Sequence, residues 1–450
     1  MSDRRFPLFP DIYLPQLRDV SLPALHHVEL IHHHTAGLAE PEQLVRSELE
    51  RSQRLCALKP GASVAIAVGS RGIGGLPAVV TAAVGWLHGR KLKPFIVPAM
   101  GSHGGADADT QRGILHAMGI DPQRMGAPIV SSMAVTQLGE TADGIPCRFS
   151  SDALAADAVL VINRVKSHTS FDRPVESGLT KMVAVGLGKA EGARFVHRLG
   201  PTGLRDVLPE LARIAIAAAP IAFGLALVEN AHKQLIRVEG VEPQHFERTD
   251  TRLLAVARRH LARLPFEQID VLVVEEIGKD ISGMGMDYAV IGRTDIRGIP
   301  NPPRPFIHKI VVLSLTAASH GNAQGIGVAD FITRRVVESV DLVDMYTNSV
   351  TAAVIEKARI PPVLPNDAEA IKAAIATSWR LHEHEVRLCI IGSTLHLNHI
   401  LVSPALAAEL AGSSSATVDP TAIAMRFSQA GRLQTRCRRA PDSRVPEVEP

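Results

Sequence analysis

Aromatic residues and a surplus of charge of one sign are both scarce in this chain of 450 residues. Phe, Trp and Tyr together make up 4% of it, and 48 Lys and Arg residues are balanced by 46 Asp and Glu residues, so the formal net charge is +2. Proteins that bind nucleic acid place basic surfaces against the phosphates, and many stack bases on aromatic side chains. We therefore expect no nucleic acid among the partners.

Cysteine is scarce as well. The four cysteines are far apart and form no Cys-x-x-Cys pair; they are Cys56, Cys147, Cys389 and Cys437. This spacing is typical of reduced thiols and not of a disulfide framework. The first residues, MSDRRFPLFPDIYLPQ, have charges with no continuous apolar stretch behind them, so no secretory signal is predicted. A cytoplasmic location is expected.

Long apolar runs are also lacking. The most apolar window, residues 207–228, is interrupted by Glu210, Arg213 and Pro220. A helix that spans a bilayer needs about 20 nearly uninterrupted apolar residues. We predict a buried helix leading into a strand at this window, and no membrane partner.

Short apolar runs, in contrast, are numerous. Apolar residues make up 46% of the chain and charged residues 21%, as in soluble globular proteins. Runs such as ASVAIAVG, DAVLVIN and IDVLVV alternate with helical patterns, which is typical of α/β folds. We predict two α/β domains with mainly parallel sheets, the N-terminal one Rossmann-like.

The chain is too long for one ordinary core, so domain boundaries are expected. We place the first domain at residues 15–265 and the second at residues 266–412, with the main boundary near Pro265. Residues 413–450 are rich in Ser, Pro and Arg, and the last 15 to 20 of them are expected to be disordered.

A glycine turn follows the first strong strand pattern. ASVAIAVG is followed by SRGIGG and then by a helical pattern, so backbone N–H groups at the start of the helix are available to an anion. The glycines stand as GxxGxGG, and the next strand, KPFIVPAM, ends without the acidic residue that would hold a ribose. This disfavours a dinucleotide. Arg71 in the turn suits a small carboxylate, with an ordinary surface arginine as the alternative.

Three further runs continue the pattern. KPFIVPAM ends in GSHGG, which places His103 in a second glycine-rich loop. A short strand is predicted at residues 127–134 and another at residues 157–163. Arg71, His103 and the segment after residue 163 all follow strands, so parallel pairing would bring them to one edge of a sheet, where ligands bind in α/β folds.

The segment of residues 163–200 is dense in glycine, histidine and lysine. It contains His168, Lys181, Lys189 and His197 among five glycines. Glycine loses the most backbone entropy on folding, so such a loop is easier to explain by a bound group than by packing. The alternative is an ordinary glycine-rich connection. A second histidine cluster, at residues 26–34, has no carboxylate or thiolate at a coordinating spacing, and an exposed or packing role is favoured over a metal site.

These motifs, in this order, resemble the nickel-pincer lactate racemases and related 2-hydroxyacid racemases and epimerases. The residues that carry the resemblance are Arg71 in the glycine turn, His103 in MGSHGG, His168 in KSHTSF, and Lys181 followed sixteen positions later by His197. The resemblance extends roughly from Val64 to Leu401. It implies an isomerase that acts on a 2-hydroxy acid and works with partner proteins that synthesise its cofactor.

In that family a lysine carries a covalently attached pyridinium thioacid and thioamide cofactor, whose sulfurs and ring carbon hold nickel together with one histidine. The resemblance implies that Lys181 anchors the cofactor and that His197 ligates nickel. Gly72 and Gly186 are the glycines expected to lie against the cofactor.

The resemblance also implies the groups that handle the substrate. His103 and His168 would be the acid and base, Arg71 would hold the substrate carboxylate, and Lys279 in the second domain would polarise the substrate oxygen. A histidine can take the hydroxyl proton at neutral pH while hydride leaves to the cofactor, and racemisation needs this on both faces.

The sequence departs from the family pattern between His168 and Lys181. These residues are thirteen positions apart, with FDRPVE between them where the family spacing is shorter, and Lys189 is a second candidate for the attachment. Two other functions stay open. One is a non-catalytic protein that binds a small anion and has lost the cofactor, and the other is a dinucleotide-dependent oxidoreductase.

Overall fold

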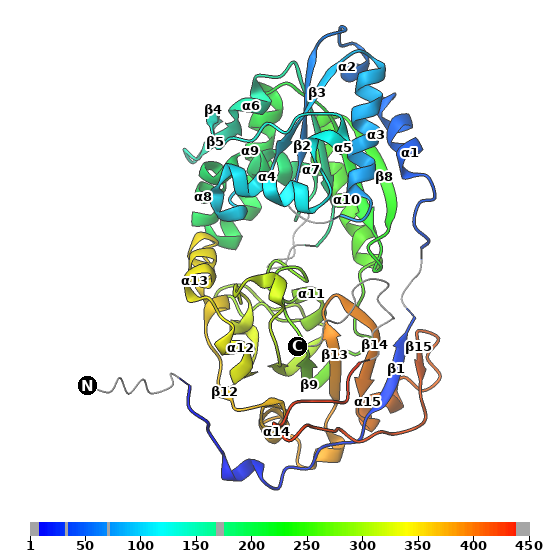
Figure 1. Ribbon diagram of the computed structural model, residues 1–450, viewed down its shortest axis with the longest axis vertical. Coiled ribbons are helices and arrows are strands. Elements are labelled where there is room, and N and C mark those ends of the chain that lie inside the picture. Colours follow the sequence, from blue (N-terminus) through cyan, green and yellow to red (C-terminus); the bar gives the residue numbers. More distant parts are fainter. Residues whose placement is uncertain (1–8, 32–34, 70–72, 168–174, 438–450) are drawn as a thin grey trace, which may run out of the picture. The chain divides into compact units, whose positions relative to one another are not determined.

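The computed structural model describes residues 9–31, 35–69, 73–167 and 175–437, with the side chains of residues 201–205 left out. The chain forms two compact units (Figure 1). One comprises His33–Leu261, and the other combines Met1–His32 with Ala262–Pro450. The predicted α/β fold with mainly parallel sheets is confirmed.

The N-terminal boundary differs from the expectation that the first domain starts at residue 15. Strand β1 (His26–Leu30) pairs antiparallel with β14 (His396–Val402) and β15 (Ala416–Val418), so the beginning of the chain belongs to the C-terminal unit. His26 lies in β1, and its Nδ1 is 2.9 Å from the Asp419 carbonyl oxygen. His32, His33 and His34 lie outside the described residues.

The unit of residues 33–261 is built on a five-stranded sheet in the order β3-β2-β6-β7-β8. The strands are β2 (Ser63–Val68), β3 (Lys93–Pro98), β6 (Ala158–Arg164), β7 (Ile221–Glu229) and β8 (Leu235–Val241). The first four strands of this order are parallel, and β8 is antiparallel to β7.

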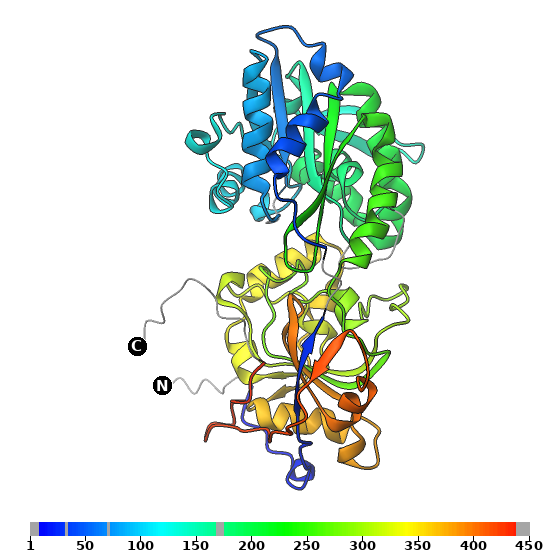
Figure 2. The ribbon, with the colours of Figure 1, turned by 90° about the vertical axis from the view of Figure 1, so that its right-hand side faces the viewer.

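Helices cover both faces of this sheet (Figure 2). In β2, Val64, Ile66 and Val68 pack with α1 (Pro41–Leu49) and α3 (Leu76–Gly89). The alternate residues of the strand face the other way, because successive side chains of a strand point to opposite faces. They pack with α8 (Lys189–Arg198), α9 (Gly200–Ala218) and α10 (Phe246–Arg259). Burial on both faces explains why these strands have continuous apolar runs.

The strand predicted at residues 127–134 is absent from the sheet. Only Ile129 forms a bridge, to Ile96 of β3, because Ile129 and Val130 are the only β-branched apolar residues of this stretch. The next residues form a separate antiparallel ribbon of β4 (Val135–Glu140) and β5 (Pro146–Ser150). Further short helices of the unit include α2 (Gln53–Cys56), α4 (Ala108–Ala117), α5 (Pro122–Met125) and α6 (Ser151–Leu154).

The C-terminal unit contains an eight-stranded sheet in the order β12-β11-β10-β9-β13-β14-β1-β15. The parallel strands are β9 (Gln268–Val274), β10 (Phe306–Val312), β11 (Phe331–Thr333), β12 (Val363–Leu364) and β13 (Leu388–Ser393). The helices are α11 (Tyr288–Ile291), α12 (Arg334–Glu338), α13 (Leu342–Thr351), α14 (Asp367–Ala376) and α15 (Pro404–Glu409). Helix α14 packs on one face of the sheet.

Part of the C-terminal stretch that was expected to be disordered is ordered. Leu433 and Cys437 are buried, and their backbone N–H groups donate to carboxylates of Asp367 at 2.9 Å and Glu275 at 3.0 Å. A Ser- and Arg-rich composition does not reveal such distant acceptors, which is why the sequence placed this stretch in the tail. Residues 438–450 lie outside the described residues.

The apolar window at residues 207–228 forms a helix followed by a strand, as predicted. Helix α9 leads into β7, all nine residues of which are buried. Among the described residues, no helix combines the length and the apolarity needed to cross a bilayer.

Candidate functional site

The carboxyl ends of β3, β2 and β6 lie side by side in the sheet of the N-terminal unit. The chain passes from β2 to β3 on one side and returns to β6 on the other side of β2. Such a reversal of strand order is where α/β folds bind ligands. The predicted Arg71 and Gly72 follow β2, and the predicted His168 follows β6. All three lie outside the described residues.

Lys181 stands at the junction of two kinds of helix. It is the last residue of α7 (Leu179–Lys181), and a π-helical turn, η3 (Met182–Gly186), follows directly. The Leu187 N–H donates to the Met182 carbonyl at 2.8 Å, which is the wider π-type spacing. Lys181 is half-buried, whereas every residue of η3 is buried. Single π turns are rare and are found at functional sites more often than elsewhere.

This π turn packs on the end of β2. A Cβ added at Gly69, the residue after β2, would lie 3.2 Å from Met182 Cε and 3.5 Å from the Asn163 side-chain oxygen. The absence of a side chain at Gly69 therefore lets the residue after Lys181 approach the middle strand. The ends of β2 and β6 and the π turn thus share one small region.

The π turn also packs on the end of β3. The Gly101 N–H donates to the Gly186 carbonyl at 3.1 Å. A Cβ at Gly186 would lie 2.7 Å from the carbonyl oxygen of Ala99, closer than side chains are found. Gly186, predicted to lie against a cofactor, is therefore also required for packing against β3.

Lys189 is tied into the protein interior. Its side chain is 0% exposed, and its Nζ donates to the Pro98 carbonyl at 2.7 Å. Burial lowers the pKa of Lys189 to about 8, and the negative charge of Asp152 opposes this shift. The amine of this second attachment candidate thus joins the start of α8 to the end of β3.

His197 shares an electrostatic environment with Lys181. The imidazole lies in the last turn of α8. Burial, followed by the positive charge of Lys181, lowers the pKa of His197 to about 4. The ring is therefore neutral at pH 7, which is the form that can bind a metal ion.

His103 stands in a loop whose backbone is fixed. The buried Gln111 donates through Nε2 to the carbonyls of Gly101 at 3.1 Å and His103 at 3.0 Å. The His103 side chain itself is exposed. A rigid backbone with an exposed imidazole is compatible with proton transfer.

Lys279 belongs to the other unit, in the loop after β9. Its Nζ donates to Gly283 O at 2.9 Å, to Gln324 Oε1 at 2.8 Å and to Asn348 Oδ1 at 2.5 Å. Its suggested role in polarising the substrate oxygen stays a prediction.

One lysine of this unit, not predicted as a candidate from the sequence, is buried. Lys357 is 2% exposed, and its Nζ contacts the Met284 sulfur. Burial, followed by the positive charge of Lys279, lowers the pKa of Lys357 to about 7. Nothing in the surrounding sequence, IEKARIPP, marks this lysine as buried.

A buried ion pair at the carboxyl ends of β6 and β7 was not predicted from the sequence. Arg164, the last residue of β6, pairs with Glu229, the last residue of β7, and both side chains are nearly inaccessible. Glu229 also accepts from the N–H of Gly74, in the glycine turn after β2. A charged residue at the end of each of two otherwise apolar strand runs was the available signal.

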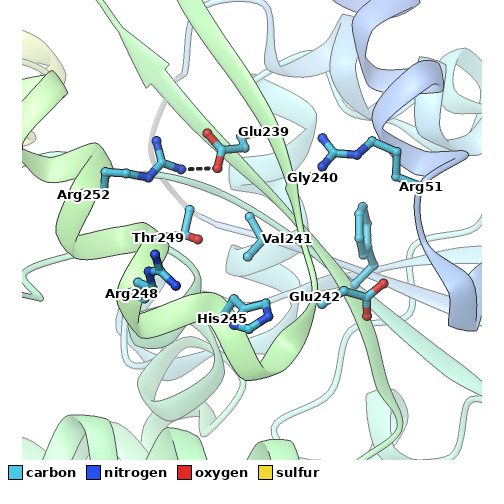
Figure 3. A pocket seen from close by; sticks show the side chains of 10 residues that line it. Arg51, Glu239, Gly240, Val241, Glu242, His245, Arg248, Thr249 and Arg252 are labelled. Atoms are coloured by element: carbon cyan, nitrogen blue, oxygen red, sulfur yellow. Dashed lines mark hydrogen bonds and ion pairs between the residues drawn. The ribbon is translucent and has the colours of Figure 1, made fainter.

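Two hollows of the surface lie away from these residues. One, of about 360 Å³, lies beside β8 and α10 (Figure 3). Arg252 and Glu239 form an ion pair on its wall. Another, of about 500 Å³, lies between α1 and α3. None of the predicted site residues lines either hollow, and within the described parts of the chain no three His, Cys, Asp or Glu side chains gather as a metal site.

Comparisons with known proteins give a likeness in structure alone. The sequence matches no protein-family model and no curated protein. Among solved structures, the chain is similar to the lactate racemase apoprotein from Thermoanaerobacterium thermosaccharolyticum, with 14% sequence identity and a TM-score of 0.42. The similarity covers 78% of this chain and 86% of that chain. At this identity and TM-score the likeness assigns no activity.

Proposed function

We propose that the chain is a racemase or epimerase of a 2-hydroxy acid that works with a lysine-linked nickel-pincer cofactor. The observation that carries the proposal is that the positive charge of Lys181 acts on the His197 imidazole, while the π turn that follows Lys181 packs on the carboxyl ends of β2 and β3. One residue offers a primary amine for a covalent link, and the other offers an imidazole that is neutral at pH 7.

The donor set of the described residues fits such a group. A cofactor that brings its own sulfur and carbon donors needs one further ligand from the protein, and a neutral imidazole suits nickel. Lys181 is half-buried, whereas the amine of Lys189 is enclosed and bonded to Pro98. This difference favours Lys181 over Lys189 as the attachment point.

The chain's own residues have three tasks in the proposed reaction. Arg71 would bind the substrate carboxylate through its planar guanidinium. One of His103 and His168 would take the hydroxyl proton when hydride leaves one face of the substrate carbon, and the other would return a proton when hydride comes back to the opposite face. An imidazole, with an ordinary pKa near 6.5, can do both at neutral pH. When bound, the cofactor supplies an electrophilic centre for the hydride from the substrate carbon.

The test is whole-protein mass spectrometry combined with metal analysis. The full chain would be produced together with the proteins that build a nickel-pincer cofactor. We expect a covalent mass addition, about one nickel per loaded chain, and interconversion of the D and L forms of at least one 2-hydroxy acid. Lys181→Ala should lack the added mass. Lys93→Ala, which changes an exposed lysine at the start of β3, should retain it.

Four results would contradict the proposal in different ways. An unmodified, nickel-free protein would exclude the cofactor. Added mass on the peptide that contains Lys189 would move the attachment. Tight binding of a carboxylate by the metal-free protein, without isomerisation of any hydroxy acid, would favour the non-catalytic binding protein, and binding of NAD would favour the oxidoreductase.

A further inference from the structure

A buried carboxylate holds the start of the helical turn that carries Lys181. Asp250, on α10, is 1% exposed. Its Oδ1 accepts from the Leu179 N–H at 3.0 Å, and its Oδ2 accepts from the Thr180 N–H at 2.8 Å. These are the first two residues of α7, and α10 packs against α7 (Figure 1). The first N–H groups of a helix have no partner within the helix, and Asp250 satisfies two of them.

The residue before this turn is shaped for the same contact. Gly178 has φ +101°, and a Cβ there would lie 2.2 Å from Asp250 Oδ1. Its carbonyl accepts from the Asn163 side-chain amide at 2.6 Å, which joins the turn to the end of β6. Glycine at residue 178 therefore admits the carboxylate, and any other residue would displace it.

A glycine in strand β7 also makes space for the side chains around this contact. A Cβ at Gly224 would lie 2.6 Å from Leu179 Cδ1 and 2.7 Å from the Phe246 ring. The side chain of Leu179, which is one of the two donors to Asp250, and the ring of Phe246, one helical turn before Asp250, thus pack directly on the strand backbone. The contact is fixed from β6, β7 and α10 together.

A carboxylate is a costly choice for a purely structural cap. No Lys or Arg side chain of the described residues pairs with Asp250, and burial raises its pKa to about 7 against the effect of the hydrogen bonds from Leu179 and Thr180. A buried charge without a cation is disfavoured, although the positive end of a helix offsets part of the penalty. A serine or asparagine would cap the helix with a smaller desolvation penalty. The use of a carboxylate that accepts through both oxygens therefore requires an explanation.

We propose that Asp250 is a positioning residue for Lys181: its two carboxylate oxygens lock the start of α7, and this fixes the direction in which the Lys181 side chain leaves the turn. The role of Lys181 rests on the proposed function above. The locking of the turn does not, because it is a property of the protein without cofactor.

The first measurement uses the full chain without cofactor. Hydrogen exchange reports the N–H groups of Leu179 and Thr180, and trace acetylation with acetic anhydride, followed by peptide mass spectrometry, reports the reactivity of Lys181 relative to Lys233. Asp250→Asn keeps the size and leaves one acceptor oxygen. We expect exchange at both N–H groups and relative acetylation of Lys181 to rise about fivefold, the effect of losing a helix cap.

The matched control is Asp157→Asn. Asp157, an exposed residue, also accepts from a backbone N–H, that of Ser63 at 2.7 Å, at the amino ends of β2 and β6 in the same sheet. This variant should leave Lys181 unchanged. Gly178→Ala supplies a second route, because it pushes the carboxylate away without changing its charge, and it should reproduce the rise in Lys181 acetylation.

The loaded enzyme gives the readout that separates positioning from stability. Per loaded chain, Asp250→Asn should lower kcat about fivefold or more and leave KM unchanged, because Asp250 touches no substrate. A variant with a lower Tm but wild-type Lys181 acetylation and wild-type kcat per loaded chain would overturn the proposal. If wild-type protein never accepts the cofactor but Lys181 acetylation responds as expected, the proposed function fails and the positioning role stands.

Discussion

Replacing Lys189 by Met tests whether this lysine is a structural tie with a buried amine. The side chain is 0% exposed and its Nζ donates to Pro98 O at 2.7 Å. Met has a similar length and no charge, so it removes the ionisable group while filling most of the same space. It also leaves the Pro98 carbonyl without its partner, which costs about 1–3 kcal/mol at every pH.

The pH dependence of the free energy of unfolding separates the effect of the buried charge from the effect of the lost hydrogen bond. Burial lowers the pKa of Lys189 to about 8 from its ordinary value of 10.5. Between these values the unfolded chain binds a proton that the folded chain does not, so the stability of the wild type rises with pH across this window. One pKa unit corresponds to about 1.4 kcal/mol, and the wild type should gain roughly 2–3 kcal/mol over the variant between pH 7 and pH 10.

Urea unfolding at pH 7, 8, 9 and 10 measures this difference. Lys91→Met is the matched control, because Lys91 has φ 61° against 52° for Lys189 but is exposed. Its difference from the wild type should not change with pH. Parallel pH profiles of the wild type and Lys189→Met would refute the buried amine, and would return Lys189 to the candidates for cofactor attachment.

Three further predictions concern other buried charges. Lys357→Met should raise the free energy of unfolding at pH 7, because burial and Lys279 lower the pKa of Lys357 to about 7. The increase of this free energy from pH 7 to pH 10 should be smaller in the variant than in the wild type by a few kcal/mol, and thermal unfolding at several pH values checks this. Arg164→Met should destabilise by about 3–5 kcal/mol, because it leaves Glu229 buried without its cation, and the double variant with Glu229→Gln should cost less than the sum in denaturant unfolding. Deleting residues 423–450 should lower Tm relative to deletion of residues 438–450 alone, by the equivalent of about 2–4 kcal/mol, because it removes the buried contacts of residues 433 and 437.

The sequence predicted where the strands lie along the chain better than which strands pair with one another. The apolar runs that became β2, β6 and β9 were recognisable because strands buried on both faces have nearly continuous apolar residues. Pairing over long distances has no such local signal. The return of β1 to a sheet made mainly by the last third of the chain depends on contacts with β14 and β15, and no pattern within residues 26–30 indicates it.

Residues of the candidate site could be predicted from the sequence only where the side-chain type itself suggests a chemical role. Lys181 and His197 stand out by type and spacing. Asp250 does not, because its helix reads as an ordinary amphipathic helix and its partners are backbone N–H groups seventy positions earlier. Contacts from a side chain to a distant backbone depend on the tertiary fold alone, so this class of positioning residue is invisible to sequence reasoning.

The glycines of residues 163–200 now have a different explanation from the one that drew attention to them. Gly178 admits the Asp250 carboxylate, Gly186 lies against the Ala99 carbonyl, and a Cβ at Gly192 would lie 3.2 Å from Arg148 Cβ. Each of these glycines is accounted for by close packing within the protein, so glycine density by itself no longer argues for a bound group. The proposal of a bound cofactor therefore rests on the half-buried Lys181 and the neutral His197. The two hydrogen bonds to Asp250 matter because they fix the start of the helical turn that carries Lys181.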